Sequence, residues 1–321
     1  MANYKELEGF GVQTLATDPD SPGWIGSIFY NSTSGTFKTV KPGGIAAGTW
    51  ASGGTLNNSR FESAAGVGTQ TAAMIVGRSS PTPVAVTEQY DGSAWTEVAD
   101  LNSARGRGQG AGASYTSALV FGGVLFPADT TSALNESWNG SAWTEVGDLP
   151  TARSDGGGFG TQTAAILAGG DRPGPTTATF SWNGTSWASA TAINTARQYN
   201  ASAGIQTAGM IFGGRTPANS AATELYNGST WTEVADLNTA RYQLGGFGTQ
   251  TSAIAAGATP AATTAEAWDG STWTTVNSLA NPAVAHNTAA GADNTSGLVA
   301  YLTATEEWTA PEVVINTLTT S

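Results

Sequence analysis

The sequence predicts an all-β fold built from six repeats of one four-stranded unit, and three observations support this prediction. A nearly identical sequence motif recurs along the chain, for example YDGSAWTEVADLNSAR at 90–105 and YNGSTWTEVADLNTAR at 226–241. The copies lie 42 to 48 residues apart, a period typical of repeat architectures. Gly, Thr and β-branched residues dominate in short extended pieces, and this composition favours strands over helices.

Two aromatic positions define the outer hairpin of each unit. Five copies place Asn-Gly or Asp-Gly between the two aromatics, and these pairs supply the positive φ angles of a tight hairpin turn. The first aromatic positions are Tyr90, Trp138, Trp182, Tyr226, Trp268 and Trp308. The second aromatic position, where the return strand begins, is a tryptophan in every copy: Trp50, Trp95, Trp143, Trp187, Trp231 and Trp273.

Two further strands precede this hairpin in each unit. A Gly/Ala-rich piece such as SDGGGFG (154–160) is followed by a turn and an apolar piece ending in Gly, such as GMIFGG (209–214). Four short antiparallel strands repeated at this period describe the blades of a β-propeller. Small residues in the first strand allow the innermost strands to crowd around the axis, and the tryptophans suit packing between neighbouring blades.

The repeat resembles kelch repeats over residues 50–308. The resemblance rests on the double Gly after the second strand, the aromatic–turn–Trp hairpin, and the L-x-x-A-R sequence that leads to the next unit. It implies a six-bladed kelch-like β-propeller. Single copies are degenerate, since Gly257 lacks the second Gly and the last unit has Tyr301-Leu302 instead of Gly-Gly.

The first and last copies are incomplete in complementary ways. Trp50 begins WASGGTLNNSR without a preceding hairpin strand of the usual form, whereas Trp308 is followed by neither Asx-Gly nor a second Trp. We therefore expect the N-terminal strand at Trp50 to complete the blade built from 283–308 and to protect a sheet edge. The alternative is that VVINTL (313–318) completes this blade.

Lysine usage separates the N-terminus from the repeats. All three lysines lie in the first 41 residues, and every later cation is Arg. The predicted organisation is an N-terminal anchoring or docking segment (1–44) containing a β-hairpin-like unit (23–41), a six-bladed propeller (45–310) and a C-terminal tail (311–321).

Composition excludes several classes of function. A formal net charge of −12 argues against nucleic acid and anionic membranes as partners. The absence of Cys excludes thiolate chemistry, and a lone His286 predicts a structural residue, so no metal or other cofactor is expected. No apolar run is long enough for membrane insertion, and MANYKELEGF lacks the features of a signal peptide.

The arginine at the end of the repeated motif either contributes to an anion-binding site or is a scaffold residue. A ring of guanidinium groups could bind an anion around the axis. A glutamate two residues before the first aromatic instead predicts an ion pair, and we favour this structural reading because scaffold contacts repeat in every blade. The arginines are Arg60, Arg105, Arg153, Arg197 and Arg241, and the glutamates are Glu88, Glu136, Glu224, Glu266 and Glu306.

Recognition is expected on the loops that vary while the scaffold repeats. In a four-stranded blade these loops share one face, opposite the uniform Asx-Gly and TQT turns. The candidate partner-binding residues on this face are Arg78, Phe126, Asp171, Arg172 and Arg215.

The N-terminal segment resembles structural proteins of bacteriophages. Tyr30-Asn31, Thr33, Gly35 and Phe37 fit the YN-x-T-x-G-x-F stretches of tail and other virion proteins. The resemblance implies a non-enzymatic virion protein (tail, fibre or capsid-decorating appendage) that is made in the host cytoplasm. It would contact other virion proteins through the N-terminal segment, and copies of itself if it forms a homo-oligomer. The alternatives are a carbohydrate-binding propeller that recognises host-surface glycan and, third, a glycan-acting enzyme with paired carboxylates.

Overall fold

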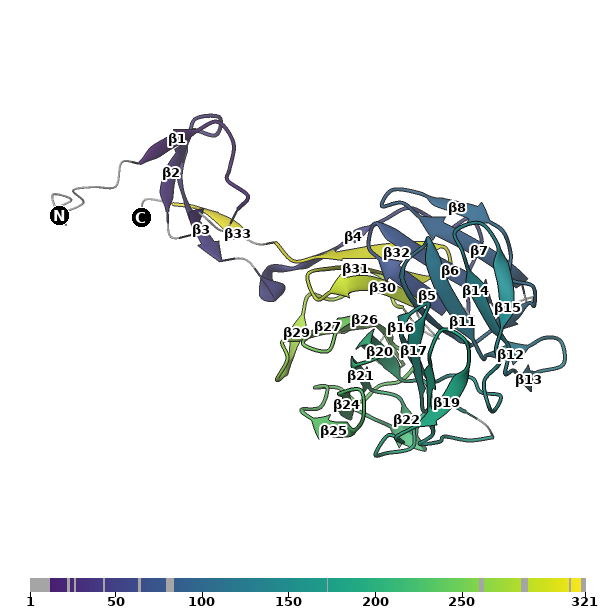
Figure 1. The fold of residues 1–321 in the computed structure, drawn as a ribbon. Helices are drawn as coiled ribbons and strands as arrows, with labels where there is room; N and C mark the ends of the chain where they lie inside the picture. The colour runs from purple at the N-terminus through teal and green to yellow at the C-terminus, as the bar shows by residue number, and fades with distance from the viewer. Residues whose placement is uncertain are drawn as a thin grey trace. The chain divides into compact units, whose positions relative to one another are not determined.

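The computed structural model describes residues 12–21, 24–25, 27–42, 44–62, 65–78, 84–171, 173–259, 263–283, 288–311 and 313–318 (Figure 1). The chain divides into two compact units. Unit 1 combines the two ends of the chain, Met1–Gly48 and Ala310–Ser321, and unit 2 is Thr49–Thr309.

Unit 2 contains six four-stranded antiparallel sheets, numbered here in chain order. Sheet 1 consists of β5 (Ala65–Thr69), β6 (Ala72–Arg78), β7 (Val84–Tyr90) and β8 (Trp95–Val98). Sheet 2 consists of β10 (Gln109–Ser114), β11 (Ser117–Phe121), β14 (Asn135–Trp138) and β15 (Trp143–Val146). Sheet 3 consists of β16 (Gly157–Thr161), β17 (Ala164–Ala168), β18 (Thr179–Trp182) and β19 (Trp187–Ala190).

The remaining three sheets follow the same plan. Sheet 4 consists of β20 (Ala201–Ile205), β21 (Ala208–Phe212), β24 (Thr223–Tyr226) and β25 (Trp231–Val234). Sheet 5 consists of β26 (Gly245–Thr249), β27 (Ser252–Ala256), β28 (Ala265–Trp268) and β29 (Trp273–Val276). Sheet 6 consists of β30 (Thr288–Asp293), β31 (Ser296–Tyr301), β32 (Ala304–Thr309) and, from the start of unit 2, β4 (Thr49–Ser52).

The fourth strand of sheet 6 comes from the N-terminal side of the unit. β4 pairs antiparallel with β32 and places Trp50 opposite Trp308. Residues 313–318, the alternative for this place, contribute β33 (Val313–Thr317) to another sheet.

The number of sheets exceeds the six that the sequence predicts. The described residues form eight sheets of three or four strands and one two-stranded sheet. The three-stranded sheet joins β9 (Arg105–Gly106), β12 (Val124–Leu125) and β13 (Thr130–Thr131), because the loop after β11 folds back onto the segment that enters sheet 2. The two-stranded sheet, β22 (Arg215–Thr216) with β23 (Ala218–Asn219), lies in the corresponding loop of sheet 4.

The first strands of sheets 1 to 6 pack against one another. Each contacts the first strand of the next sheet, and β30 of sheet 6 contacts β5 of sheet 1. Small residues permit this approach: at Gly110 a Cβ atom would lie 2.7 Å from Cγ1 of Val67 and 2.8 Å from Cβ of Ala65. The contacts between the first strands therefore follow a cyclic order around a line that we call the axis, and their Gly/Ala content permits this close approach.

Neighbouring sheets are joined by the tryptophans that begin the fourth strands. The indole N–H groups of Trp95, Trp143 and Trp273 each donate to a threonine hydroxyl of the preceding sheet, at 2.9 to 3.1 Å. These tryptophans are 5 to 6% exposed and lie among apolar residues of two adjacent sheets. The predicted packing of tryptophan between sheets is observed at these positions.

Unit 1 is a four-stranded sheet and not a hairpin with a separate tail. Its order is β1 (Gln13–Leu15), β2 (Ile28–Asn31), β3 (Thr36–Pro42) and β33, with β1 parallel to β2 and the other pairs antiparallel. The predicted hairpin is present, with Tyr30 opposite Phe37. The sequence predicts that 311–321 is a separate tail, and the structure corrects this prediction. The β-branched VVINT segment in it forms a strand that pairs with β3.

The boundaries between the two units also differ from the predicted 45–310. A short 3₁₀ helix, η2 (Ile45–Ala47), precedes β4 and belongs to unit 1, so unit 2 begins at Thr49 and ends at Thr309.

Candidate functional site

The repeated arginines are part of the scaffold. All five are at most 4% exposed. Four form ion pairs of 2.5 to 3.1 Å with the glutamate that precedes the first aromatic, namely Arg60–Glu88, Arg105–Glu136, Arg197–Glu224 and Arg241–Glu266. Their guanidinium groups are buried in these contacts, so they do not offer a solvent-facing ring of charge for an anion.

Two units lack this pair and use substitutes. In sheet 3, Phe180 stands where the other sheets carry Glu, and the guanidinium of Arg153 lies 5.0 Å from its ring centroid. In sheet 6, Pro282 replaces the arginine, and Glu306 accepts hydrogen bonds from the Tyr301 hydroxyl and the N–H groups of Ala280 and Asn281. In these two sheets, the remaining member of the pair therefore has another contact in place of the ion pair.

A ring of strained residues lies two positions after each repeated arginine. We call it the axial ring. Its members are not glycine, yet each has a φ of 55 to 59°: Glu62, Arg107, Asp155, Tyr199 and Gln243. Each of the last four donates its backbone N–H to the carbonyl of the member before it, at 2.6 to 3.2 Å. Left-handed backbone at non-glycine residues is unfavourable and is found preferentially at functional sites.

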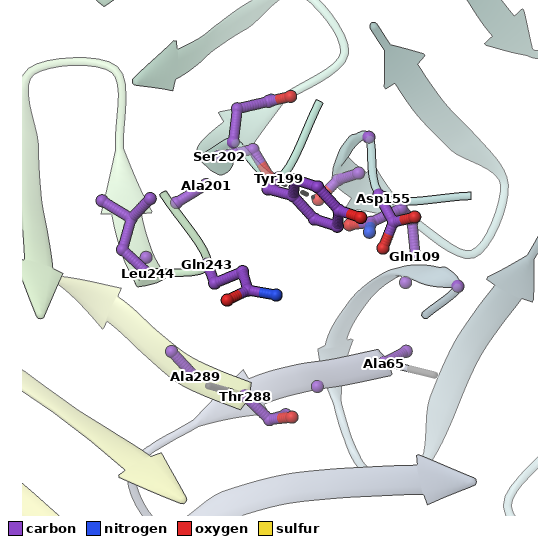
Figure 2. A pocket seen from close by; sticks show the side chains of 17 residues that line it. Ala65, Gln109, Asp155, Tyr199, Ala201, Ser202, Gln243, Leu244, Thr288 and Ala289 are labelled. Atoms are coloured by element: carbon purple, nitrogen blue, oxygen red, sulfur yellow. Dashed lines mark hydrogen bonds between the residues drawn. The ribbon is translucent and has the colours of Figure 1, made fainter. Parts of the chain in front are cut away.

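Three members of the axial ring, Asp155, Tyr199 and Gln243, line a cavity at the beginning of the first strands. The cavity has a volume of about 110 Å³ and is lined by residues of all six sheets or the segments entering them (Figure 2). The polar side chains on its wall come from Gln109, Asp155, Tyr199, Asn200, Ser202, Gln243 and Thr288. We call it the axial cavity.

A charged and aromatic cluster adjoins the axial cavity. Arg107 donates from Nε and Nη2 to both carboxylate oxygens of Asp155, at 3.0 and 2.7 Å, and from Nη2 to the Tyr199 hydroxyl at 2.8 Å. Burial raises the pKa of Asp155 to about 6, although Arg107 opposes this shift. The Tyr199 ring lies 5.9 Å from that of Tyr242, over which Arg215 is placed at 5.4 Å.

Comparison with known proteins gives a fold but no family. No family model matches the chain, and no curated protein matches it. A solved structure titled "Structure of YjhT", a kelch-type β-propeller, is similar with a TM-score of 0.63 and 13% sequence identity, covering 81% of this chain and 99% of that chain. The fold is a β-propeller. At this identity the likeness carries no activity, and we refer to unit 2 below as the propeller.

The structure brings one predicted loop residue into the cluster and places a second beside it. Arg215 lies over the ring of Tyr242, which is next to Tyr199 of the cluster. Asp171 forms a β-bridge with Ser154, the neighbour of Asp155. Arg78 instead donates to the carbonyl of Ser59 at 2.7 Å.

The other predicted positions contribute less. Phe126 is half-buried and directly follows β12. Arg172 and His286 lie outside the described residues.

Sequence reasoning missed the axial ring. The sequence does contain an indication of it. The residue two positions after each arginine varies (Glu, Arg, Asp, Tyr and Gln in chain order), whereas the motif before it is repeated. The role of this variable position becomes apparent only when five segments are brought together around the axis, and the sequence of one copy does not show that arrangement.

The opposite end of the axis has a different character. A second cavity of about 460 Å³ there is lined by Gly, Ala and Thr with Ile205 and Gln250. No titratable side chain belongs to the described lining of this cavity. Across the described ranges, no three His, Cys, Asp or Glu side chains are grouped as metal ligands. Within the same ranges, no helix is long and apolar enough to cross a membrane.

Proposed function

We propose that the chain is a non-enzymatic virion protein of a bacteriophage, in which unit 1 attaches to the particle and the propeller presents its variable-loop face. The observation that carries the proposal is the distribution of exposed apolar side chains. Among the described residues, seven large apolar side chains are exposed, and five of them belong to unit 1: Val12, Ile25, Ile28, Phe37 and Leu318. Unit 1 is less than a fifth of the chain, and concentrated exposed apolar surface marks interaction sites.

The connections between the units also support attachment by unit 1 and presentation of loops by the propeller. The propeller is inserted between the two segments of unit 1, so both ends of the propeller continue into that unit. The stretch that resembles phage structural proteins forms β2, β3 and the turn between them. Unit 1 would thus hold the propeller at two points while its own exposed side chains contact the particle.

Within the propeller we propose a kelch-type ring of six blades closed by β4. Sheets 1 to 6 are the blades, and the support is the cyclic order of contacts between their first strands together with the pairing of β4 with β32. The three-stranded and two-stranded sheets would then be insertions in the variable loops of blades 2 and 4. A closed ring leaves no open edge between the first and last blades.

The attachment proposal is tested by incorporation into particles. In a host that supplies the chain to a phage from which the gene is deleted, purified particles should contain the wild-type chain by mass spectrometry. Phe37→Ser should reduce its occupancy about tenfold, because Phe37 is 50% exposed and burial of that exposed half on attachment is worth about 1.5 kcal/mol. Ile205→Ser in the propeller is the matched control, since Ile205 is 53% and Phe37 50% exposed. Absence of the chain from particles, or equal loss with both variants, would contradict the proposal.

A carbohydrate-binding propeller is the second candidate, and the axial cavity favours it. Its wall carries amides and hydroxyls, the groups that hydrogen-bond to sugar hydroxyls, and aromatic rings lie beside it. This function is compatible with a virion role, because an attached propeller could contact host-surface glycan.

A further inference from the structure

Asn200 carries a buried amide that no described side chain or backbone group contacts by a hydrogen bond. The residue is 6% exposed and lines the axial cavity, and among the described residues neither its Nδ2 nor its Oδ1 has a hydrogen-bond partner. Of the buried side chains in the described ranges, Asn200 is the one with two such atoms. A buried amide without a protein partner is costly, so a water molecule or a ligand in the cavity has to supply both an acceptor and a donor.

The other polar groups on the cavity wall have the same dual character. Gln109, Gln243, Ser202 and Thr288 present amides and hydroxyls, which both donate and accept hydrogen bonds. Figure 2 shows the side chains of Tyr199, Gln243 and Thr288 around the same opening, each from a different sheet or the segment that enters it. The ligand that matches such a wall carries several hydroxyl groups, because each hydroxyl also donates and accepts.

The charge at the cavity wall favours a neutral ligand. Asp155 is the one carboxylate among the described lining residues, and Arg107 binds both of its oxygens. An ionic ligand would therefore meet no uncompensated charge of opposite sign at the wall and would lose its hydration.

The size of the cavity limits the ligand to about one sugar ring. A volume of about 110 Å³ holds several water molecules at roughly 10–15 Å³ each, which is room for a ring with its hydroxyls but not for a chain. The half-buried rings of Tyr199 and Tyr242 lie at the side of the cluster, with Arg107 over the first ring and Arg215 over the second. The next unit of a longer glycan would contact these rings and guanidinium groups together.

We propose that the axial cavity binds the terminal sugar of a neutral glycan, with Asn200 and Gln243 as its principal hydrogen-bonding residues. The left-handed backbone of Gln243 supports this role, because glycine would relieve the strain there and yet a polar side chain occupies the position. The proposal goes beyond attachment to a particle and does not depend on it, since glycan binding is measured with the purified chain alone.

The test uses two variants of the cavity and one control. Gln243→Gly removes the amide at a position where φ is 59° and glycine is favoured, so the fold should not be weakened. Asn200→Ala removes the unpartnered amide. Ile205→Ser changes the other end of the axis and serves as the control.

Each protein is applied to an array of immobilised neutral and acidic glycans, and to glucose, galactose, mannose and N-acetylglucosamine in saturation-transfer NMR. The wild type and Ile205→Ser should bind neutral glycans equally. Gln243→Gly and Asn200→Ala should each bind about tenfold more weakly, the effect of one lost hydrogen bond of good geometry.

The proposal would be overturned if no neutral glycan or monosaccharide bound, or if Gln243→Gly bound undiminished with an unchanged melting temperature. Preference for acidic glycans would also overturn it. Failure of attachment appears separately, as loss of the chain from particles while glycan binding by the purified chain is retained.

Discussion

Arg105→Met is expected to lower the free energy of unfolding of the propeller by about 3–5 kcal/mol, because it leaves a buried carboxylate without its counter-ion. Arg105 is fully buried, and its Nη1 donates to Oε1 of Glu136 at 2.8 Å. Glu136 would keep its hydrogen bonds from Asn102 but would lose the guanidinium with which it forms its ion pair. Burial lowers the pKa of Arg105 and the charge of Glu136 opposes that shift, so the two groups depend on each other.

Guanidinium-induced unfolding followed by Trp fluorescence measures this loss. The signal reports mainly on the propeller, because ten of the eleven tryptophans lie in Thr49–Thr309. Arg153→Met is the matched control and should cost less, about 1–2 kcal/mol, because Phe180 replaces the glutamate there. The double variant Arg105→Met/Glu136→Gln should recover part of the loss. Equal losses for Arg105→Met and Arg153→Met would contradict the assigned role of the ion pair.

Trp308→Ala is expected to destabilise the propeller by about 3–5 kcal/mol, the usual cost of truncating a buried large aromatic side chain. Trp308 is fully buried, and its indole N–H donates to the carbonyl of Asn294 at 2.8 Å. Its ring lies 5.3 Å from that of Trp50, which β4 contributes from the start of unit 2. The substitution therefore removes core volume and the packing surface for the closing strand.

The same unfolding measurement with Trp50→Ala provides the comparison. Trp50 is half-buried, so its removal should cost about half as much as that of Trp308, given that the hydrophobic term follows the buried area. If Trp50→Ala had no effect on the free energy of unfolding, packing of β4 against sheet 6 would not stabilise the propeller.

The local features of the fold are predictable from the sequence because each copy specifies them. In the turn after Tyr90, Asp91 accepts N–H hydrogen bonds from Ser93 and Ala94, and Gly92 has a φ of 95°. The turn is thus specified by residues within the hairpin, but it differs from the predicted tight turn. Residues 91–94 lie between the paired Tyr90 and Trp95, and of the Asx-Gly pair only Gly92 has a positive φ. The pairing of the repeated Arg with a Glu is also visible in the pattern, and four of the five arginines form it.

Features that depend on distant segments are not predictable in this way. β33 pairs with β3 across most of the chain, and nothing within VVINT distinguishes that pairing from a place in the last sheet. The axial ring is equally non-local, because its side chains are brought together only when five segments meet at the axis. Loop residues such as Arg215 could be singled out by variability, but their neighbours could not.

Disulfide formation between β4 and β32 tests closure of the ring most directly. Thr49 and Thr309 lie opposite each other, both are exposed, and the chain has no native cysteine. Opposed residues in an antiparallel pair are close enough for a disulfide. Thr49→Cys/Thr309→Cys should therefore oxidise completely, whereas Ser52→Cys/Thr309→Cys, displaced along the strand, should not. Mass spectrometry after thiol alkylation of the folded protein reads the outcome. Two fully alkylated cysteines in Thr49→Cys/Thr309→Cys would contradict a propeller closed by its N-terminal strand.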